Sequence, residues 1–128
     1  MKYVIIVMSS PYGGEKSRSA FLFSNNLLSL GHTIDIVFFY SHGVLNANSM
    51  IYVANDDCNI LHEWEKLHQN FQVPLHICIN SSLKRGLINH KQSVMLEYKR
   101  SHISSCFILS GFMELFHAIQ KTDRVIQF

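Results

Sequence analysis

The sequence predicts an α/β protein with a three-layer α/β/α sandwich, in which helices cover both faces of a mainly parallel five-stranded sheet. Continuously apolar, β-branched segments alternate along the chain with segments whose apolar residues recur at helical spacing. No internal repeat or flexible linker interrupts this alternation. A length of 128 residues is typical of one domain, so we expect residues 1–128 to form a single domain.

The predicted strands are short runs of consecutive apolar residues, a pattern typical of parallel strands buried between two helical layers. The first run ends at Ser9, Ser10 and Pro11, which favour a turn. Pro74 can open the third strand, because proline is tolerated at the first residue of a strand. Strands are expected at residues 3–8, 33–40, 75–79, 106–109 and 124–128.

The predicted helices lie between these strands. The clearest one starts near residue 59 and places Ile60, Trp64, Leu67 and Phe71 on one stripe. Gly31 suits the position after a helix, because glycine adopts left-handed backbone angles without strain. Further helices are expected at 16–30, at 111–121, behind an N-cap formed by Ser81 and Ser82, and near 90–98, whereas 43–48 is expected to be a loop.

The composition excludes several classes of protein. Hydrophobic residues make up 48% of the chain and charged residues 16%, a balance that argues against disorder and predicts a compact protein. The formal net charge of +2 is too small for direct binding to nucleic acid. Few charges combined with many apolar side chains also indicate that another protein covers part of the surface.

The cysteines and the apolar runs bear on the compartment. Three cysteines form an odd set, which argues against a disulfide framework and favours a reducing compartment. The first apolar run is shorter than the core of a signal peptide, and no run approaches the ~20 residues that span a bilayer. We therefore expect a cytoplasmic protein that does not contact membranes.

Cys78 is the candidate reactive residue. It lies near the carboxyl end of the third predicted strand, the edge of a parallel sheet where ligands and reactive groups collect. The free N–H groups and positive dipole end of the following helix would stabilise its thiolate. Cys106 begins a strand at the opposite edge, and Cys58 follows two aspartates whose charge disfavours a thiolate. On position alone, an inert buried cysteine explains Cys78 equally well.

Two other patterns are weaker. Residues 9–17 connect a strand to a helix and could hold a phosphate, but Glu15 stands where a Walker A sequence requires glycine. A small phosphate- or nucleotide-binding module is therefore a minor alternative. Cys58 and His62 are four residues apart, but two ligands without a third and fourth do not define a metal site.

Nine short blocks together resemble the DsrE family of small sulfur-transfer proteins. Each block alone is weak, but their order and spacing are fairly specific and extend from end to end of the chain. Cys78 matches the sulfur-carrying cysteine of that family. The blocks are residues 11–13, 38–40, 43–44, 46–48, 64–67, 73–79, 83–86, 109–111 and 123–128.

The resemblance implies a sulfurtransferase subunit of a heterohexamer, a dimer of heterotrimers with TusB- and TusC-like subunits. Cys78 would receive sulfur as a persulfide from a TusA-like donor and pass it to a TusE-like acceptor, for 2-thiolation of the wobble uridine of tRNA by a later enzyme. Such a relay requires no metal and no organic cofactor. The alternative is a scaffold subunit of the hetero-oligomer whose cysteine is inert.

Overall fold

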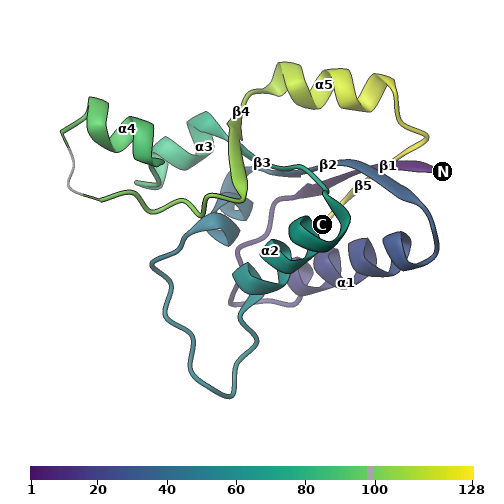
Figure 1. The fold of residues 1–128 in the computed structure, drawn as a ribbon, viewed down its shortest axis with the longest axis horizontal. Helices are drawn as coiled ribbons and strands as arrows, with labels where there is room; N and C mark the ends of the chain where they lie inside the picture. The colour runs from purple at the N-terminus through teal and green to yellow at the C-terminus, as the bar shows by residue number, and fades with distance from the viewer. Residues whose placement is uncertain (98–99) are drawn as a thin grey trace.

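The structure, a computed structural model, describes residues 1–97 and 100–128 and contains a five-stranded sheet with helices on both faces (Figure 1). All strand pairs are parallel, in the order β4-β3-β2-β1-β5. The predicted three-layer α/β sandwich is therefore confirmed. The strands are β1 (Lys2–Val7), β2 (Thr33–Phe39), β3 (Leu75–Cys78), β4 (Phe107–Ser110) and β5 (Arg124–Gln127).

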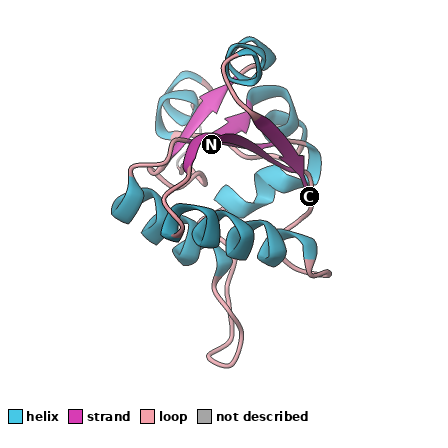
Figure 2. Ribbon diagram, turned by 90° about the vertical axis from the view of Figure 1, so that its right-hand side faces the viewer, coloured by secondary structure: helices cyan, strands magenta, loops and turns pink. Residues whose placement is uncertain are grey.

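The helices form the two outer layers. Helices α1 (Lys16–Ser29) and α2 (Ile60–Phe71) cover one face of the sheet, and α5 (Phe112–Gln120) covers the other (Figures 1 and 2). The short helices α3 (Ile79–Lys84) and α4 (His90–Met95) follow the end of β3. Among the described residues, no helix has the length and apolar character needed to cross a membrane.

The two faces of the sheet are packed differently. On the α1 and α2 face, Trp64 is fully buried and its ring meets Phe39 and Phe21 edge-on, with ring centroids 5.2 Å and 5.6 Å apart. Such aromatic contacts add to the free energy gained from burial. On the other face α5 buries Leu115, while three of its apolar side chains remain more than half exposed. These are Phe112, Met113 and Phe116.

A buried asparagine joins the segments that follow the first two strands to both helices of one layer. The Oδ1 atom of Asn46 accepts hydrogen bonds from Ser17 in α1 and from the Trp64 indole in α2. Its Nδ2 donates to the carbonyl oxygens of Ser9 and Gly43, at 3.1 Å and 2.8 Å. Because a buried amide without partners is costly, this network fixes the positions of all four segments.

Residues Ser41–Ala47, part of which we expected to be a loop, form a 3₁₀ helix, η1. That prediction was wrong because local composition did not reveal the tertiary contacts that hold the segment. Besides Asn46, these include a close approach of Gly43 to β1: a Cβ atom at Gly43 would lie 1.9 Å from the carbonyl oxygen of Val7. Only a residue without a side chain fits there.

The region after β3 also differs from the prediction. Helix α3 begins at Ile79, so Ser81 and Ser82 lie inside the helix and are not its N-cap. Because Ile79 is apolar, the sequence predicted that the strand continues through it. In the structure β3 ends one residue earlier, at Cys78. The helix predicted near 90–98 is α4, and residue 98 lies outside the described residues. Phe71, expected on the buried stripe of α2, is exposed at the end of that helix.

Replacing Gly43 by alanine should destabilise the fold, because the added methyl group collides with the backbone of β1. We expect the free energy of unfolding of Gly43→Ala to fall by about 1–3 kcal/mol. Urea unfolding followed by Trp64 fluorescence measures this loss. Gly14→Ala is the matched control, because nothing lies within 4 Å of a Cβ atom at Gly14. Equal stability of the two variants would contradict the close approach.

Candidate functional site

Cys78 is the last residue of β3 and lies at the carboxyl edge of the sheet, as predicted. Only 3% of the residue is exposed to solvent. It is not sealed in the core, however, because it lines a pocket of about 180 Å³ that opens to the surface. The other lining residues are Ile79, Asn80, Ser110, Gly111 and Phe112.

The backbone changes from strand to helix directly at Cys78. Its φ and ψ angles of −65° and 123° are extended, and the residue is also the N-cap of α3. The first N–H groups of a helix lack partners within the helix and point back past its N-cap. The helix expected behind Cys78 is therefore present, and it starts closer to the cysteine than the sequence suggested.

The opposite wall of the pocket comes from β4 and the start of α5. Ser110 is the register partner of Cys78 across the β3–β4 pair. Gly111 follows as the N-cap of α5, and its N–H donates a 3.0 Å hydrogen bond to the Glu114 carboxylate. Phe112 packs against Tyr40 and Phe38, with ring centroids 5.2 Å and 6.1 Å away. These contacts hold the start of α5 over the end of β2.

His76 is a polar residue of this region that the sequence analysis did not single out. Its Nδ1 atom lies 3.0 Å from the hydroxyl oxygen of Ser110. Burial lowers the pKa of His76 below the ordinary 6.5, and the Glu114 carboxylate opposes this shift in part. His76 precedes Cys78 by two residues in a strand, so both side chains lie on one face of the sheet. That spacing was the signal available in the sequence.

The carboxylate near His76 is itself stabilised in its charged form. The N–H groups of Glu114 and Gly111 hydrogen-bond to the Glu114 carboxylate and lower its pKa. The nearby His76 and His117 act in the same direction, although more weakly. Glu114 is therefore a negative charge at the start of α5, next to the pocket.

Helix α3 is tied to η1 rather than left free at the edge of the sheet. The backbone N–H of Ser41 donates to the Ser81 hydroxyl at 3.1 Å. The Arg85 guanidinium donates to the Ser81 carbonyl at 3.0 Å and to the Ser41 hydroxyl at 3.4 Å. Ser82 is buried, and its hydroxyl has no hydrogen-bond partner within the described ranges. These serines therefore anchor and pack the helix behind Cys78.

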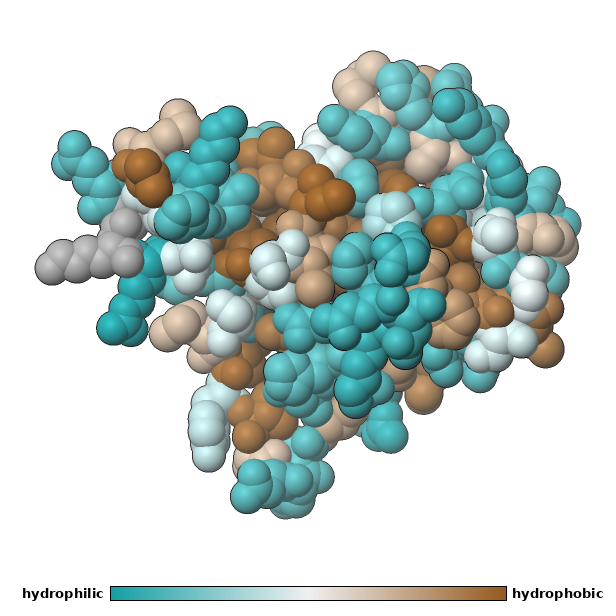
Figure 3. Space-filling view, viewed as in Figure 1, coloured by the Kyte–Doolittle hydropathy of each residue, from teal (hydrophilic) through white to brown (hydrophobic). Residues whose placement is uncertain are grey.

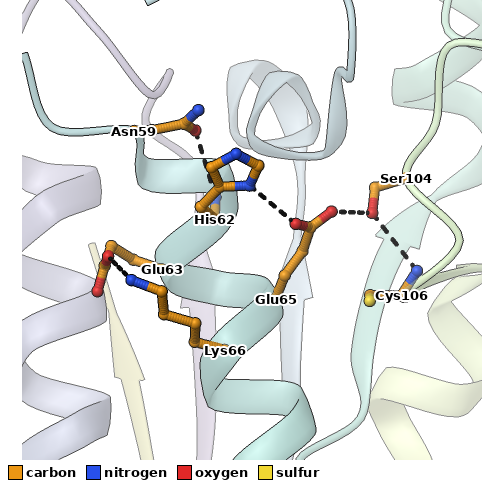
Figure 4. A network of polar contacts seen from close by, with 7 residues as sticks. All are labelled: Asn59, His62, Glu63, Glu65, Lys66, Ser104 and Cys106. Atoms are coloured by element: carbon orange, nitrogen blue, oxygen red, sulfur yellow. Dashed lines mark hydrogen bonds and ion pairs between the residues drawn. The ribbon is translucent and has the colours of Figure 1, made fainter. Parts of the chain in front are cut away.

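The other two cysteines lie away from this pocket. Cys106 immediately precedes β4, at the amino edge of the sheet, where its N–H donates to Ser104. The Ser104 hydroxyl donates to Glu65 of α2 at 2.6 Å, and Glu65 pairs with His62 at 3.1 Å (Figure 4). This network joins α2 to the segment before β4. His62 thus contacts a carboxylate, and the described part of the chain contains no group of three or more potential metal ligands.

Cys58 is exposed and lines a separate pocket of about 210 Å³ beside the turn between β1 and α1. Glu15 and Asp57 also line this pocket, together with Arg18. Two carboxylates against one guanidinium disfavour an anion there. The turn in residues 9–17 is thus poorly suited to hold a phosphate.

The fold and the pocket define a small parallel α/β protein with a thiol at the carboxyl edge of its sheet. The DsrE/DsrF-like family matches residues 1–128, and this chain belongs to that family. Proteins named Sulfurtransferase TusD are similar over the full chain. The one from Buchnera aphidicola subsp. Acyrthosiphon pisum is 41% identical, with both sequences covered completely, and the one from Pectobacterium atrosepticum is 38% identical, with 100% of this chain and 99% of the relative covered.

A solved structure supports the fold. The crystal structure of the ychN protein from E. coli superposes with a TM-score of 0.78 at 21% sequence identity, covering 100% of both chains. The family match and the relatives named Sulfurtransferase TusD confirm the predicted family membership, and the chain is a sulfurtransferase.

Because burial lowers the pKa of His76, the unfolded chain binds more protons than the folded one just below pH 6.5. The contribution of His76 to stability should therefore decrease as the pH falls through this range. The substitution His76→Asn keeps an amide where Nδ1 lies but cannot titrate. We expect wild type to lose more free energy of unfolding than His76→Asn between pH 7.5 and roughly pH 5.5. Urea unfolding at both pH values measures the difference.

The matched control for this comparison is His62→Asn, because His62 is exposed on α2. Its stability should change with pH as that of wild type does, apart from any loss of the pair with Glu65. A pH dependence of His76→Asn identical to that of wild type would contradict the burial of a neutral imidazole.

Proposed function

We propose that Cys78 carries the transferred sulfur as a persulfide and that the protein is one subunit of a sulfur relay. In this proposal the sulfur arrives from a TusA-like donor, leaves to a TusE-like acceptor and ends as the 2-thio group of a tRNA wobble uridine. The observation that carries the proposal is the position of Cys78, at the carboxyl edge of the sheet and on the wall of an open pocket. The names of the relatives support the same class of activity.

The transfer chemistry needs only thiols. The Cys78 thiolate attacks the outer sulfur of the donor persulfide and forms a new S–S bond. The old S–S bond breaks, and its electron pair leaves with the donor cysteine as a thiolate. In the second transfer the acceptor thiolate attacks the outer sulfur on Cys78, and the Cys78 thiolate is the leaving group. Each transfer is therefore balanced without a metal or an organic cofactor.

The surroundings of Cys78 suit a protected carrier. Phe112 and Ile79 contribute apolar walls to the pocket, which limit access of water and oxidants to a reactive sulfur. A 3% exposed cysteine cannot react with a flat protein surface. Its partners must therefore present their reactive cysteines on extended segments that enter the pocket.

The exposed face of α5 supports association with TusB- and TusC-like subunits. Phe112, Met113 and Phe116 are 54%, 64% and 53% exposed, which is unusual for neighbouring large apolar residues on one short helix. Apolar side chains also gather at the surface near β4, between α3 and α5 (Figure 3). The net charge of +2 agrees with a carrier that passes sulfur to proteins and leaves contact with tRNA to a later enzyme.

A scaffold subunit with an inert cysteine is the second candidate, and the near-complete burial of Cys78 favours it. The two functions differ in one measurable property. A carrier must accept sulfur at Cys78, whereas a scaffold assembles equally well without that thiol.

Incubation of the full chain with glutathione persulfide should load one sulfur atom onto Cys78. Mass spectrometry should find a labile adduct of about 32 Da on the peptide that contains Cys78. Cys78→Ser should lose this adduct, and Cys106→Ser, the matched control at the other edge of the sheet, should keep it. Equal loading of Cys78→Ser and wild type would exclude Cys78 as the carrier. Unchanged relay flux in Cys78→Ser would establish the scaffold function.

A negative charge on the exposed face of α5 should weaken assembly, because it would be buried against apolar partner residues. We expect Phe116→Glu to reduce the affinity for coexpressed TusB- and TusC-like subunits at least about tenfold, while persulfide loading of Cys78 is kept. Copurification and sedimentation of the assembly measure this effect. Leu30→Glu, at an exposed position after α1, is the control. Normal assembly of Phe116→Glu would show that this face is not the interface.

A further inference from the structure

His76, Cys78 and Ser110 form a polar group at the ends of β3 and β4. Cys78 and Ser110 line the pocket, and His76 contacts Ser110. His76 and Cys78 are separated by one residue in β3 and lie on one face of the sheet. Ser110 is the register partner of Cys78, and its hydroxyl oxygen lies 3.0 Å from His76 Nδ1. Ser110 is buried and lines the same pocket as Cys78. Its hydroxyl is therefore held beside the space into which the cysteine opens.

A persulfide would place a second sulfur in this space. The outer sulfur lies about 2.05 Å beyond the cysteine Sγ, so loading extends the side chain into the pocket. Ile79 and Phe112 offer it apolar side chains and Asn80 offers an exposed amide, whereas Ser110 offers a buried hydroxyl that already lies within hydrogen-bond distance of His76. We propose that the Ser110 hydroxyl binds the outer sulfur of the Cys78 persulfide and that His76, acting through Ser110, takes up the proton of the persulfide and later returns it. This inference rests on the proposed function of Cys78.

In this proposal the Ser110 hydroxyl donates to the Nδ1 atom of a neutral His76, and each proton that leaves one group is taken up by another. After loading, the neutral persulfide Cys78–S–SH gives its proton to the Ser110 oxygen, while the Ser110 proton moves to His76 Nδ1. The products are the anion Cys78–S–S⁻ and the His76 imidazolium, with Ser110 donating to the sulfur anion. Before delivery the two protons move back, and the acceptor thiolate attacks the neutral persulfide. Cys78 then leaves as a thiolate, and His76 is neutral again.

The charges around His76 fit this role. Burial lowers the pKa of His76 and keeps the imidazole neutral while the pocket is empty. The charged group that acts on it is Glu114 from α5, which favours the imidazolium, and Glu114 is in turn influenced by His117. The register neighbours of His76, Phe38 in β2 and Ile108 in β4, carry no charge. A persulfide anion would add a second negative charge nearby and favour the imidazolium further.

The direct test is an NMR titration of His76 in the full-length wild-type protein, before and after loading with glutathione persulfide. We expect the pKa of His76 to rise by roughly half a unit or more on loading, because the persulfide anion stabilises the imidazolium. The rise should be smaller in Ser110→Ala, where only the charge of the persulfide anion acts on His76, and kept in Ser110→Thr, which retains the hydroxyl. An unchanged His76 titration in loaded wild type would overturn the proposal, and this result needs no variant to fold.

A second measurement follows sulfur delivery from loaded Cys78 to cyanide, which forms thiocyanate. We expect His76→Asn and Ser110→Ala to deliver sulfur about fivefold to tenfold more slowly than wild type near pH 7. Their rate relative to wild type should change with pH across the His76 titration. The control His62→Asn should match wild type at every pH. Rates equal to wild type in both variants would overturn the inference.

The two proposals fail in distinguishable ways. If wild-type Cys78 takes up no sulfur from glutathione persulfide, the proposed carrier function is wrong, and this inference is wrong with it. If Cys78 loads normally but the His76 titration and the delivery rates do not depend on Ser110, only the role of His76 and Ser110 is wrong.

Discussion

The parallel pairing of β3 with β4 is the constraint on which the pocket depends. Its register sets Cys78 opposite Ser110, and each of these residues ends its strand. Helices α3 and α5 begin directly afterwards, so two strand ends and two helix starts meet at one edge of the sheet. A shift of β3 by one residue would turn Cys78 toward the α1 and α2 layer and remove the thiol from the pocket.

Polar contacts behind the pocket hold the segments that follow the strands. Asn46 joins η1 to α1 and α2, and Gly43 lets η1 lie against the end of β1. Ser41, the first residue of η1, holds α3 by donating its N–H to the Ser81 hydroxyl. The Arg85 guanidinium joins the same two residues by donating to the Ser81 carbonyl and to the Ser41 hydroxyl. These polar groups are buried or partly buried, so leaving them without partners would cost free energy of folding. They are paired only in this arrangement of the segments. The scaffold behind Cys78 is therefore specified by hydrogen bonds, and the layers on either side by apolar packing.

Burial and access make opposite demands on the sulfur. A 3% exposed thiol is shielded from oxidants, yet a sulfur carrier, the role proposed for Cys78, has to meet the cysteine of another protein. The pocket of about 180 Å³ reconciles these demands, because it admits an extended side chain but not a surface. The apolar side chains left exposed on α5 lie on the helix that starts at this pocket. A partner bound there would also shield the Cys78 thiol from solvent.

The sequence by itself determined the order of strands and helices, the parallel sheet and the place of Cys78 near its carboxyl edge, because apolar periodicity is a local property that survives without tertiary context. It did not show that Ile79 already belongs to a helix, because an apolar residue after a strand fits both states. The contact between His76 and Ser110 was decided only by the tertiary structure. The two residues are 34 positions apart, and only the register of two parallel strands brings their polar atoms together.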